Sequence, residues 1–209
     1  MAEPARSPAL PAALDGHAWP AQGDWTYEDY LRLPDDGNRY EVIRGVLHVT
    51  AAPYPLHQYV SSQLHLLVGG FVRERKLGVV LSAPVDVRLP QRIGDPVQPD
   101  LFFLRTGNQP RWKADRSFDG APDLAIEVLS RSTAHRDRKI KKDAYREAGI
   151  REYWLVDPWA PSIVVYLLSE DRRRYVELCR GGEGDAVRSA VLSGLEVRVS
   201  DLLPDEEEE

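Results

Sequence analysis

Hydrophobic positions recur along the chain with two different periods. Residues 57–75 predict an amphipathic helix, because apolar side chains fall three or four positions apart on one face. These positions are Val60, Leu64, Leu67, Val68 and Phe71. Residues 39–50 instead alternate around Arg44-Gly45, which predicts a β-hairpin. Residues 124–129, LAIEVL, are almost continuously apolar, as is typical of a strand that is covered on both faces.

Shorter patterns fill the rest of the chain. Helices are predicted at 24–32 and at 135–148, the second ending at Gly149. Further strands are predicted at 79–89 with a break near Pro84, 101–104, 152–156, 162–168, 174–179 and 195–199. The order strand, helix, strand from 124 to 156 predicts a crossover, but the hairpins argue against an all-parallel sheet. We therefore expect an α/β fold, a mixed β-sheet flanked by helices with additional β-hairpins.

The length of 209 residues suits one domain with a sizeable core. We expect a flexible N-terminal arm over 1–22, which is rich in Ala and Pro, a single domain over 23–203 and an acidic tail over 204–209. No apolar run reaches the roughly 18 residues that a membrane-spanning helix needs, and no secretory signal follows Arg6. These features predict a cytoplasmic protein without a membrane partner. The only cysteine, Cys179, excludes an internal disulfide and a thiolate metal cage.

The net charge of −6 argues against a large, sequence-independent surface for DNA. It is compatible with an acidic catalytic centre that has a basic rim. The segment 131–142 is strongly basic, with Arg131, Arg136, Arg138, Lys139, Lys141 and Lys142. Such a run is usually a solvated helix face. Because it directly follows the strand of Glu127, it is also a candidate for attracting a phosphate backbone.

Two carboxylates stand out against this background. Glu127 interrupts an apolar strand, where a buried charge needs a partner; it is either a satisfied core charge or a metal ligand or acid–base group. Asp100 follows Pro99 and is either a turn residue or a second carboxylate beside Glu127. If the two strands are neighbours, the carboxylates would repel unless a cation lay between them, and Mg²⁺ prefers oxygen ligands.

A third candidate lies on the helix that follows Glu127. Asp137, Lys141 and Tyr145 are spaced four apart, so they line one face. They are either an ion pair with a packed tyrosine or part of a site. Other chemistries lack their motifs, since the chain has no glycine-rich phosphate loop, no G-x-S-x-G elbow and no histidine or cysteine cluster with zinc spacing.

Together these residues resemble a known family. The matching string is Pro99-Asp100, Glu127 to Ser130, Thr133, Asp137, Lys141, Tyr145 and Glu152 to Pro158, with Tyr40-Glu41, Gly45 and His57 upstream. It is similar to the Uma-two family of the PD-(D/E)XK restriction-endonuclease-like superfamily. The resemblance covers roughly residues 25–180, and its specific part runs from Pro122 to Pro158.

The resemblance implies a divalent-metal site at one edge of the mixed sheet. Asp100 and Glu127 would hold Mg²⁺, with Mn²⁺ as a possible substitute, and Glu41 would be a further acidic ligand. Residue 129, two after Glu127, is leucine where the superfamily has lysine. In this family Lys141 takes that role from the following helix.

The resemblance further implies supporting roles for Asp137 and Tyr145, which would orient Lys141, and for His57. The leading hypothesis is a Mg²⁺-dependent endonuclease that hydrolyses phosphodiester bonds in DNA, and a homodimer would suit the cutting of two strands. A catalytically degenerate nuclease-fold module with a binding or regulatory role is the alternative. A metal-independent carboxylate-pair hydrolase is a third hypothesis, but it leaves the basic helix unexplained.

Overall fold

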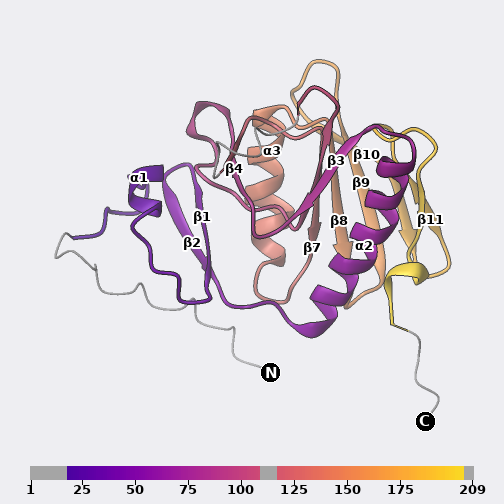
Figure 1. Cartoon of the computed structure of the whole chain (residues 1–209), viewed down its shortest axis with the longest axis horizontal. Coiled ribbons are helices and arrows are strands. Elements are labelled where there is room, and N and C mark those ends of the chain that lie inside the picture. Colours follow the sequence, from indigo (N-terminus) through magenta and orange to yellow (C-terminus); the bar gives the residue numbers. More distant parts are fainter. Residues whose placement is uncertain (1–17, 109–116, 205–209) are drawn as a thin grey trace, which may run out of the picture.

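The computed structural model describes residues 18–108 and 117–204 (Figure 1). Most of the expected N-terminal arm and all but one residue of the expected acidic tail lie outside the described residues. At the described end of the arm, Trp19 stacks on Trp25 at 5.3 Å between ring centroids. Gln22 accepts a hydrogen bond from the backbone N–H of Leu47 at 2.8 Å. The packed part of the chain therefore includes Trp19.

Six strands form the central sheet in the order β10-β9-β8-β7-β5-β3. Their bounds are β3 Gly78–Ser82, β5 Leu101–Arg105, β7 Leu124–Val128, β8 Glu152–Asp157, β9 Ser162–Leu168 and β10 Tyr175–Gly182. Only β7 and β8 pair in parallel within this sheet. A helical segment over residues 136–148 connects these two strands, as the predicted crossover requires. The expected mixed sheet with flanking hairpins is confirmed.

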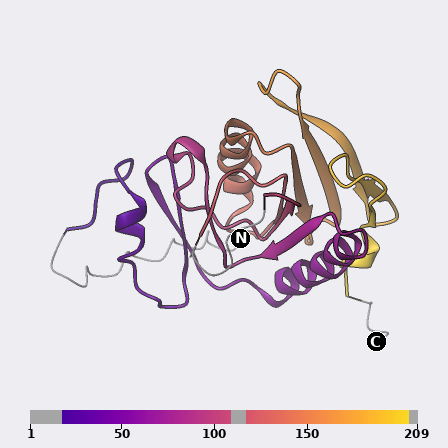
Figure 2. The ribbon, with the colours of Figure 1, turned by 45° about the horizontal axis from the view of Figure 1, so that its top comes forward.

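Helices cover the sheet on both faces (Figure 2). Helix α2, Pro55–Glu74, packs Val60, Leu64 and Val68 into one core with every second residue of β7. The other core lies under α3, Lys142–Ala148, and takes the alternate residues of the same strand. All five residues of β7 are buried, which explains why its sequence is almost continuously apolar.

Smaller elements surround this frame. They are α1 Tyr27–Tyr30, η1 Pro90–Arg92, η3 Ser200–Leu202, and the strand pairs β1 Arg39–Ile43 with β2 Val46–Thr50, β4 Asp86–Arg88 with β6 Ser117–Asp119, and β11 Ala186–Arg188 with β12 Glu196–Arg198. The predicted turn of the first hairpin is confirmed, since Arg44 and Gly45 both have positive φ. A Cβ at Gly45 would collide with the carbonyl oxygen of Gly23, so this turn requires glycine.

The predicted helix over 135–148 differs from an ordinary α-helix. It contains a π-helical turn, η2, over Arg136–Lys141, followed by α3. It ends where predicted, at Gly149, whose φ of 85° closes the helix. Strands β6 and β11 were not expected, and each has only three residues, too few to show a period. Among the described residues, no helix is long and apolar enough to span a membrane.

Candidate active site

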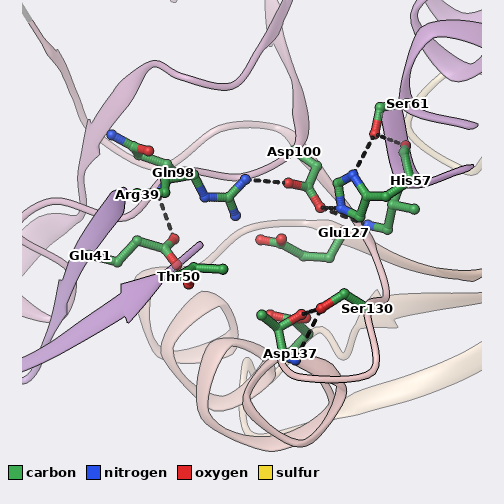
Figure 3. A network of polar contacts seen from close by, with 12 residues as sticks. Arg39, Glu41, Thr50, His57, Ser61, Gln98, Asp100, Glu127, Ser130 and Asp137 are labelled. Carbon is green, nitrogen blue, oxygen red and sulfur yellow. Dashed lines mark hydrogen bonds and ion pairs between the residues drawn. The ribbon is translucent and has the colours of Figure 1, made fainter. Parts of the chain in front are cut away.

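Four carboxylates from separate parts of the chain meet at one end of the sheet (Figure 3). Glu41 lies in β1, Asp100 directly precedes β5, Glu127 lies in β7 and Asp137 lies in the π-helical turn η2. All four are buried, with at most 4% of any residue exposed. The pairing of β5 with β7 matches Leu101 with Ile126, so the next positions place Asp100 opposite Glu127. The predicted proximity of these two residues is confirmed by this register.

Asp100 has a complete set of partners. Its Oδ1 accepts a hydrogen bond from Arg39 Nη1 at 2.7 Å. Its Oδ2 accepts one from the backbone N–H of Val128 at 2.9 Å and lies 3.2 Å from Nε2 of His57. Burial alone would raise the pKa of Asp100, but the charge of Arg39 and the bond with His57 hold it well below its ordinary value. These partners therefore favour the ionised form of Asp100.

His57 reaches Asp100 from the first turns of α2. Ser61, one turn later, donates to the carbonyl oxygen of His57 at 2.8 Å, and its hydroxyl lies 3.5 Å from His57 Nδ1. His57 thus contacts Asp100 through one ring nitrogen while the other faces Ser61. The structure places His57 against Asp100, and the supporting role that the family resemblance implies stays a prediction.

Glu127 has a different environment. Its Oε1 accepts hydrogen bonds from Lys141 Nζ at 2.8 Å and from the Tyr145 hydroxyl at 2.6 Å. Burial, reinforced by the nearby charges of Asp100 and Asp137, outweighs the attraction of Lys141 and raises the pKa of Glu127 to about 8. A carboxyl with such a pKa changes its protonation state near neutral pH, which is common in functional sites.

Lys141 is fully buried between two carboxylates. Its Nζ lies 2.8 Å from Glu41 Oε1 as well as 2.8 Å from Glu127 Oε1. Burial would lower the pKa of Lys141, but Glu127 and Glu41 raise it above its ordinary value. The same attraction, together with Arg136, overcomes the burial of Glu41 and lowers its pKa to about 2. Lys141 therefore carries its charge inside the protein because two carboxylates surround it.

Two buried carboxylate oxygens have no hydrogen bond from the described part of the chain. They are Glu41 Oε2 and Asp137 Oδ1. Each has only an ion-pair contact with Arg136, at 3.3 Å and 3.9 Å respectively. Burial raises the pKa of Asp137 above its ordinary value. Unsatisfied acceptors of this kind are rare in protein interiors and call for an explanation, and here both belong to the same site.

Sequence reasoning missed Arg39 as a member of this site. Arg39 lies two residues before Glu41 in β1, so the two side chains share a face of the hairpin; that spacing was the signal available. Arg136 was noted only as part of a basic run, yet its Nη2 pairs with Glu41 and donates to Thr50 Oγ1 at 2.9 Å. With Lys141 these arginines give three positive charges against four carboxylates.

A model of the Uma2 family, described as "Putative restriction endonuclease", matches residues 27–200. The chain belongs to the Uma2 family. A search of curated proteins found no match.

A solved structure with the same fold as this Uma2 chain is that of a "putative nuclease belonging to DUF820" from Anabaena variabilis. The two chains are 19% identical, with a TM-score of 0.71 over 85% of this chain and 97% of the other. The expected family and the nuclease-type fold are thereby confirmed.

The chemistry of this Uma2 site is of the kind that a hard divalent cation prefers, because its acidic side chains offer carboxylate oxygens and two of these oxygens lack hydrogen bonds. Within the described residues, however, no group of three or more His, Cys, Asp or Glu side chains has the arrangement to hold an ion. Arg39 and Lys141 lie against the carboxylates instead. Arg39 would have to release Asp100 before an ion could take its place.

The basic run that follows Glu127 does not form one continuous rim. Arg136 and Lys141 turn inward to the carboxylates. Arg138 pairs with Asp157 at 2.8 Å, and the Lys142 amine lies over the ring of Tyr166. Arg131 and Lys139 remain exposed. The solvated-face interpretation is therefore wrong for Lys141, which is buried, and for Arg136, which is partly buried. The phosphate-binding interpretation applies to fewer residues than the sequence suggested.

A cleft of ≈ 360 Å³ opens beside Asp100. It lies between α2 and the end of β3, and its lining includes Arg39, His57, Gln58 and Ser82. Among the four site carboxylates, Asp100 alone lines this cleft. Arg39 also lines an adjoining cleft of ≈ 510 Å³ on the side of α1. Solvent therefore reaches the site past Asp100 and Arg39, whereas Lys141 is buried behind them.

Proposed function

We propose that this chain is a Mg²⁺-dependent endonuclease that hydrolyses phosphodiester bonds in DNA. The observation that carries the proposal is the pair Asp100 and Glu127, opposite each other on neighbouring strands, with the amine of Lys141 2.8 Å from Glu127. Two carboxylates and a lysine at a sheet end are the groups that the restriction-endonuclease-like family uses. The family and the nuclease-type fold support the proposal.

Asp100 and Glu127 would hold the ion, and Glu41 would support it through its unsatisfied Oε2. Mn²⁺ is a suitable substitute because it also accepts oxygen ligands. A bound divalent ion supplies Lewis-acid chemistry at a phosphodiester and neutralises its negative charge. An ion at Asp100 would have to displace Arg39, whose side chain lines the cleft and is 20% exposed.

The residues of the chain would each hold a charge or a proton in place. Lys141 is kept protonated by Glu41 and Glu127, so it offers a fixed positive charge for a phosphate. Tyr145 donates to the same oxygen of Glu127 as Lys141 does and thereby orients that carboxylate. His57 is a positioning residue, since it contacts Asp100 at the cleft. Asp137 lies beside Arg136 and balances its charge.

Cleavage of plasmid and linear DNA with Mg²⁺, Mn²⁺ and a chelator tests the proposal. Glu127→Ala should abolish cleavage, while Glu183→Ala, which changes an exposed loop residue, should leave the rate unchanged. Circular dichroism would verify that both variants fold. Unchanged cleavage by Glu127→Ala would refute the assignment, and activity that persists in the chelator would point to the metal-independent hydrolase instead.

A binding or regulatory module with a degenerate site is the second candidate. One observation favours it: the carboxylates already have protein cations as partners, and no ligand group for an ion is assembled among the described residues. Calorimetric titration with Mg²⁺ and Mn²⁺ separates the two candidates. Heat that disappears in Asp100→Asn supports the nuclease, whereas no site-dependent heat in the wild type favours the module.

Two further properties remain predictions. Cutting both DNA strands is simplest with two sites, so we propose a homodimer, which sedimentation analysis would detect as a concentration-dependent increase in mass. We also propose a cytoplasmic location, in keeping with a DNA substrate. Fractionation of cells that express the full chain would test it, and recovery from a secreted fraction would contradict it.

A further inference from the structure

Two large aromatic side chains lie exposed and in contact at the end of the sheet where the carboxylates meet. Tyr54, directly before α2, is 58% exposed, and Trp159, in the turn between β8 and β9, is 41% exposed. Their rings lie 6.4 Å apart between centroids and nearly perpendicular, at 89°. Single exposed apolar residues are ordinary on protein surfaces, but an adjoining aromatic pair beside a candidate site indicates a contact surface.

An arginine completes this surface. The guanidinium carbon of Arg131 lies 4.5 Å from the ring centroid of Trp159, within the range of a cation–π contact. Arg131 is itself exposed. We call Tyr54, Arg131 and Trp159 the aromatic platform. It combines flat apolar area with a positive charge.

The platform is held in place by its turn. Asp157 Oδ1 accepts hydrogen bonds from the backbone N–H groups of Trp159, at 3.0 Å, and Ala160, at 3.1 Å. The other carboxylate oxygen of Asp157 accepts from Arg138 at 2.8 Å. These bonds fix the backbone that carries Trp159, so little conformational entropy is lost when a ligand settles on the ring.

Three connections place the platform beside the candidate site. Arg131 follows Glu127 by four residues, and the N–H of Leu129 donates to the carbonyl of Val156, so the ends of β7 and β8 lie together. Pro53, the neighbour of Tyr54, lines the cleft that contains Asp100. A ligand on the platform therefore extends naturally to the mouth of that cleft.

We propose that the aromatic platform binds an unpaired base of single-stranded DNA and so directs the proposed nuclease toward single-stranded segments. Aromatic rings and arginine together bind unpaired bases by stacking while the charge attracts the adjacent phosphate. A duplex presents only the edges of its bases in the grooves, so it offers no base face that could stack on the aromatic side chains. Because the net charge is −6, contacts with phosphates alone would bind DNA weakly, and stacking of a base on the platform would supply the missing affinity. The link to cleavage rests on the proposed function, whereas the binding of single-stranded DNA by the platform does not.

Fluorescence anisotropy with a labelled single-stranded oligodeoxyadenylate, in a chelator to prevent cleavage, tests the proposal on the full chain. Trp159→Ala should weaken binding about tenfold, which corresponds to the loss of one stacked base, and Trp159→Phe should retain most of the affinity. An abasic oligomer with the same number of phosphates should bind the wild type and Trp159→Ala equally. Arg131→Ala should reduce the salt dependence by about one phosphate contact.

Tyr59→Ala is the matched control, because Tyr59 is an exposed aromatic residue within α2, at 39%, and lies outside the platform. This variant should bind as the wild type does. Equal affinity of Trp159→Ala and wild type for the adenylate oligomer would overturn the proposal. So would the same loss with the abasic oligomer or with duplex DNA, or a loss confined to an RNA oligomer. If the platform binds but Mn²⁺ never produces cleavage, the proposed function fails while the stacking site stands.

Discussion

Two buried glutamates at opposite ends of the parallel strands β7 and β8 have opposite surroundings. Glu152, at the start of β8, receives hydrogen bonds on both oxygens. The donors are Trp154 Nε1, the Ser189 hydroxyl, and the backbone N–H groups of Ala190 and Val191, at 2.6 to 2.9 Å. Glu127, near the end of β7, receives hydrogen bonds from Lys141 and Tyr145 on the same oxygen, Oε1, and faces other carboxylates.

This difference separates a carboxylate that is satisfied within the fold from one that we propose to act in the site. The donors of Glu152 are neutral groups that anchor the segment between β11 and β12 to the sheet. Glu127 instead lies among the charged groups of Lys141, Asp100 and Asp137, and burial raises its pKa to about 8. Burial alone would therefore not identify the site, since both residues are at most 1% exposed. The two glutamates differ instead in whether both carboxylate oxygens accept hydrogen bonds and in whether the neighbouring groups are charged.

The largest effect on stability should come from Glu152. Glu152→Ala leaves four donors without an acceptor, and we expect the free energy of unfolding to fall by about 4 kcal/mol. Glu127→Ala at pH 8 should lower the free energy of unfolding by only about 1 kcal/mol. The ionised carboxylate of Glu127 is disfavoured in the fold, and Lys141 keeps its ion pair with Glu41 in this variant. Urea denaturation of both variants measures the difference. Equal losses would mean that Glu127 is structural as well.

Removal of the buried amine should have the next largest effect. Lys141→Met leaves Glu41 and Glu127 without their shared cation, and a buried pair that loses one partner costs about 3 kcal/mol. Adding Glu41→Gln should recover part of this loss, because Glu41, whose pKa is lowered to about 2, is the carboxylate that stays ionised in the fold. A double-mutant cycle measures the coupling. Strict additivity of the two changes would contradict the short contacts of Lys141.

The pH dependence of stability should reflect the raised pKa of Glu127. Between its ordinary value of 4.5 and about 8, the folded chain keeps a proton that the unfolded chain releases. Stability therefore declines as pH rises through this window, by roughly 1 kcal/mol per pH unit. Glu127→Gln should remove this decline, and urea titrations from acid to mildly basic pH would show it. A wild type that becomes more stable over the window, relative to Glu127→Gln, would contradict the raised pKa.

The smallest change concerns a single hydroxyl. Tyr145→Phe removes the 2.6 Å bond to Glu127 and should cost about 1 kcal/mol of stability while it slows cleavage. Tyr153→Phe is the matched control, because the Tyr153 hydroxyl donates to the backbone carbonyl of Asp137 at 2.9 Å rather than to a carboxylate. It should cost similar stability and leave the pH profile of cleavage unchanged. Identical profiles for the two variants would remove Tyr145 from the site.

Much of the fold could be predicted because its main elements are long enough for the hydrophobic pattern to repeat several times. The hairpin over 39–50 and the helix over 57–75 form close to the expected residues, and the strand over 124–129 is buried on both faces. Three-residue strands such as Ser117–Asp119 have no period to recognise. The π-helical turn was invisible too, since residues spaced four apart look α-helical in a sequence.

The site could be predicted only in part, because its charges are balanced by residues distant in the chain. The apolar run around Glu127 alone raised suspicion of that residue, and the family resemblance supplied Asp100 as its partner and Lys141 as the lysine of the site. Arg39 meets Asp100 across 61 positions, a pairing that no local pattern encodes. Glu152 belongs to the same family string as Glu127, yet only the structure shows that its partners are neutral and that it lies at the far end of the neighbouring strand.

The π-helical turn over Arg136–Lys141 keeps three site residues in line. A spacing of four slightly exceeds one α-helical turn of about 3.6 residues and falls short of the wider π turn. Lys141 therefore lies slightly short of one full rotation from Asp137 in the π turn, whereas Tyr145 lies slightly beyond one full rotation from Lys141 in α3. The two deviations have opposite signs, so the three side chains stay on one face of the helix. Deleting one residue here would rotate Tyr145 by about 100° away from Glu127, with every side chain of the site intact. The number of residues in this turn is therefore as necessary to the site as the side chains themselves.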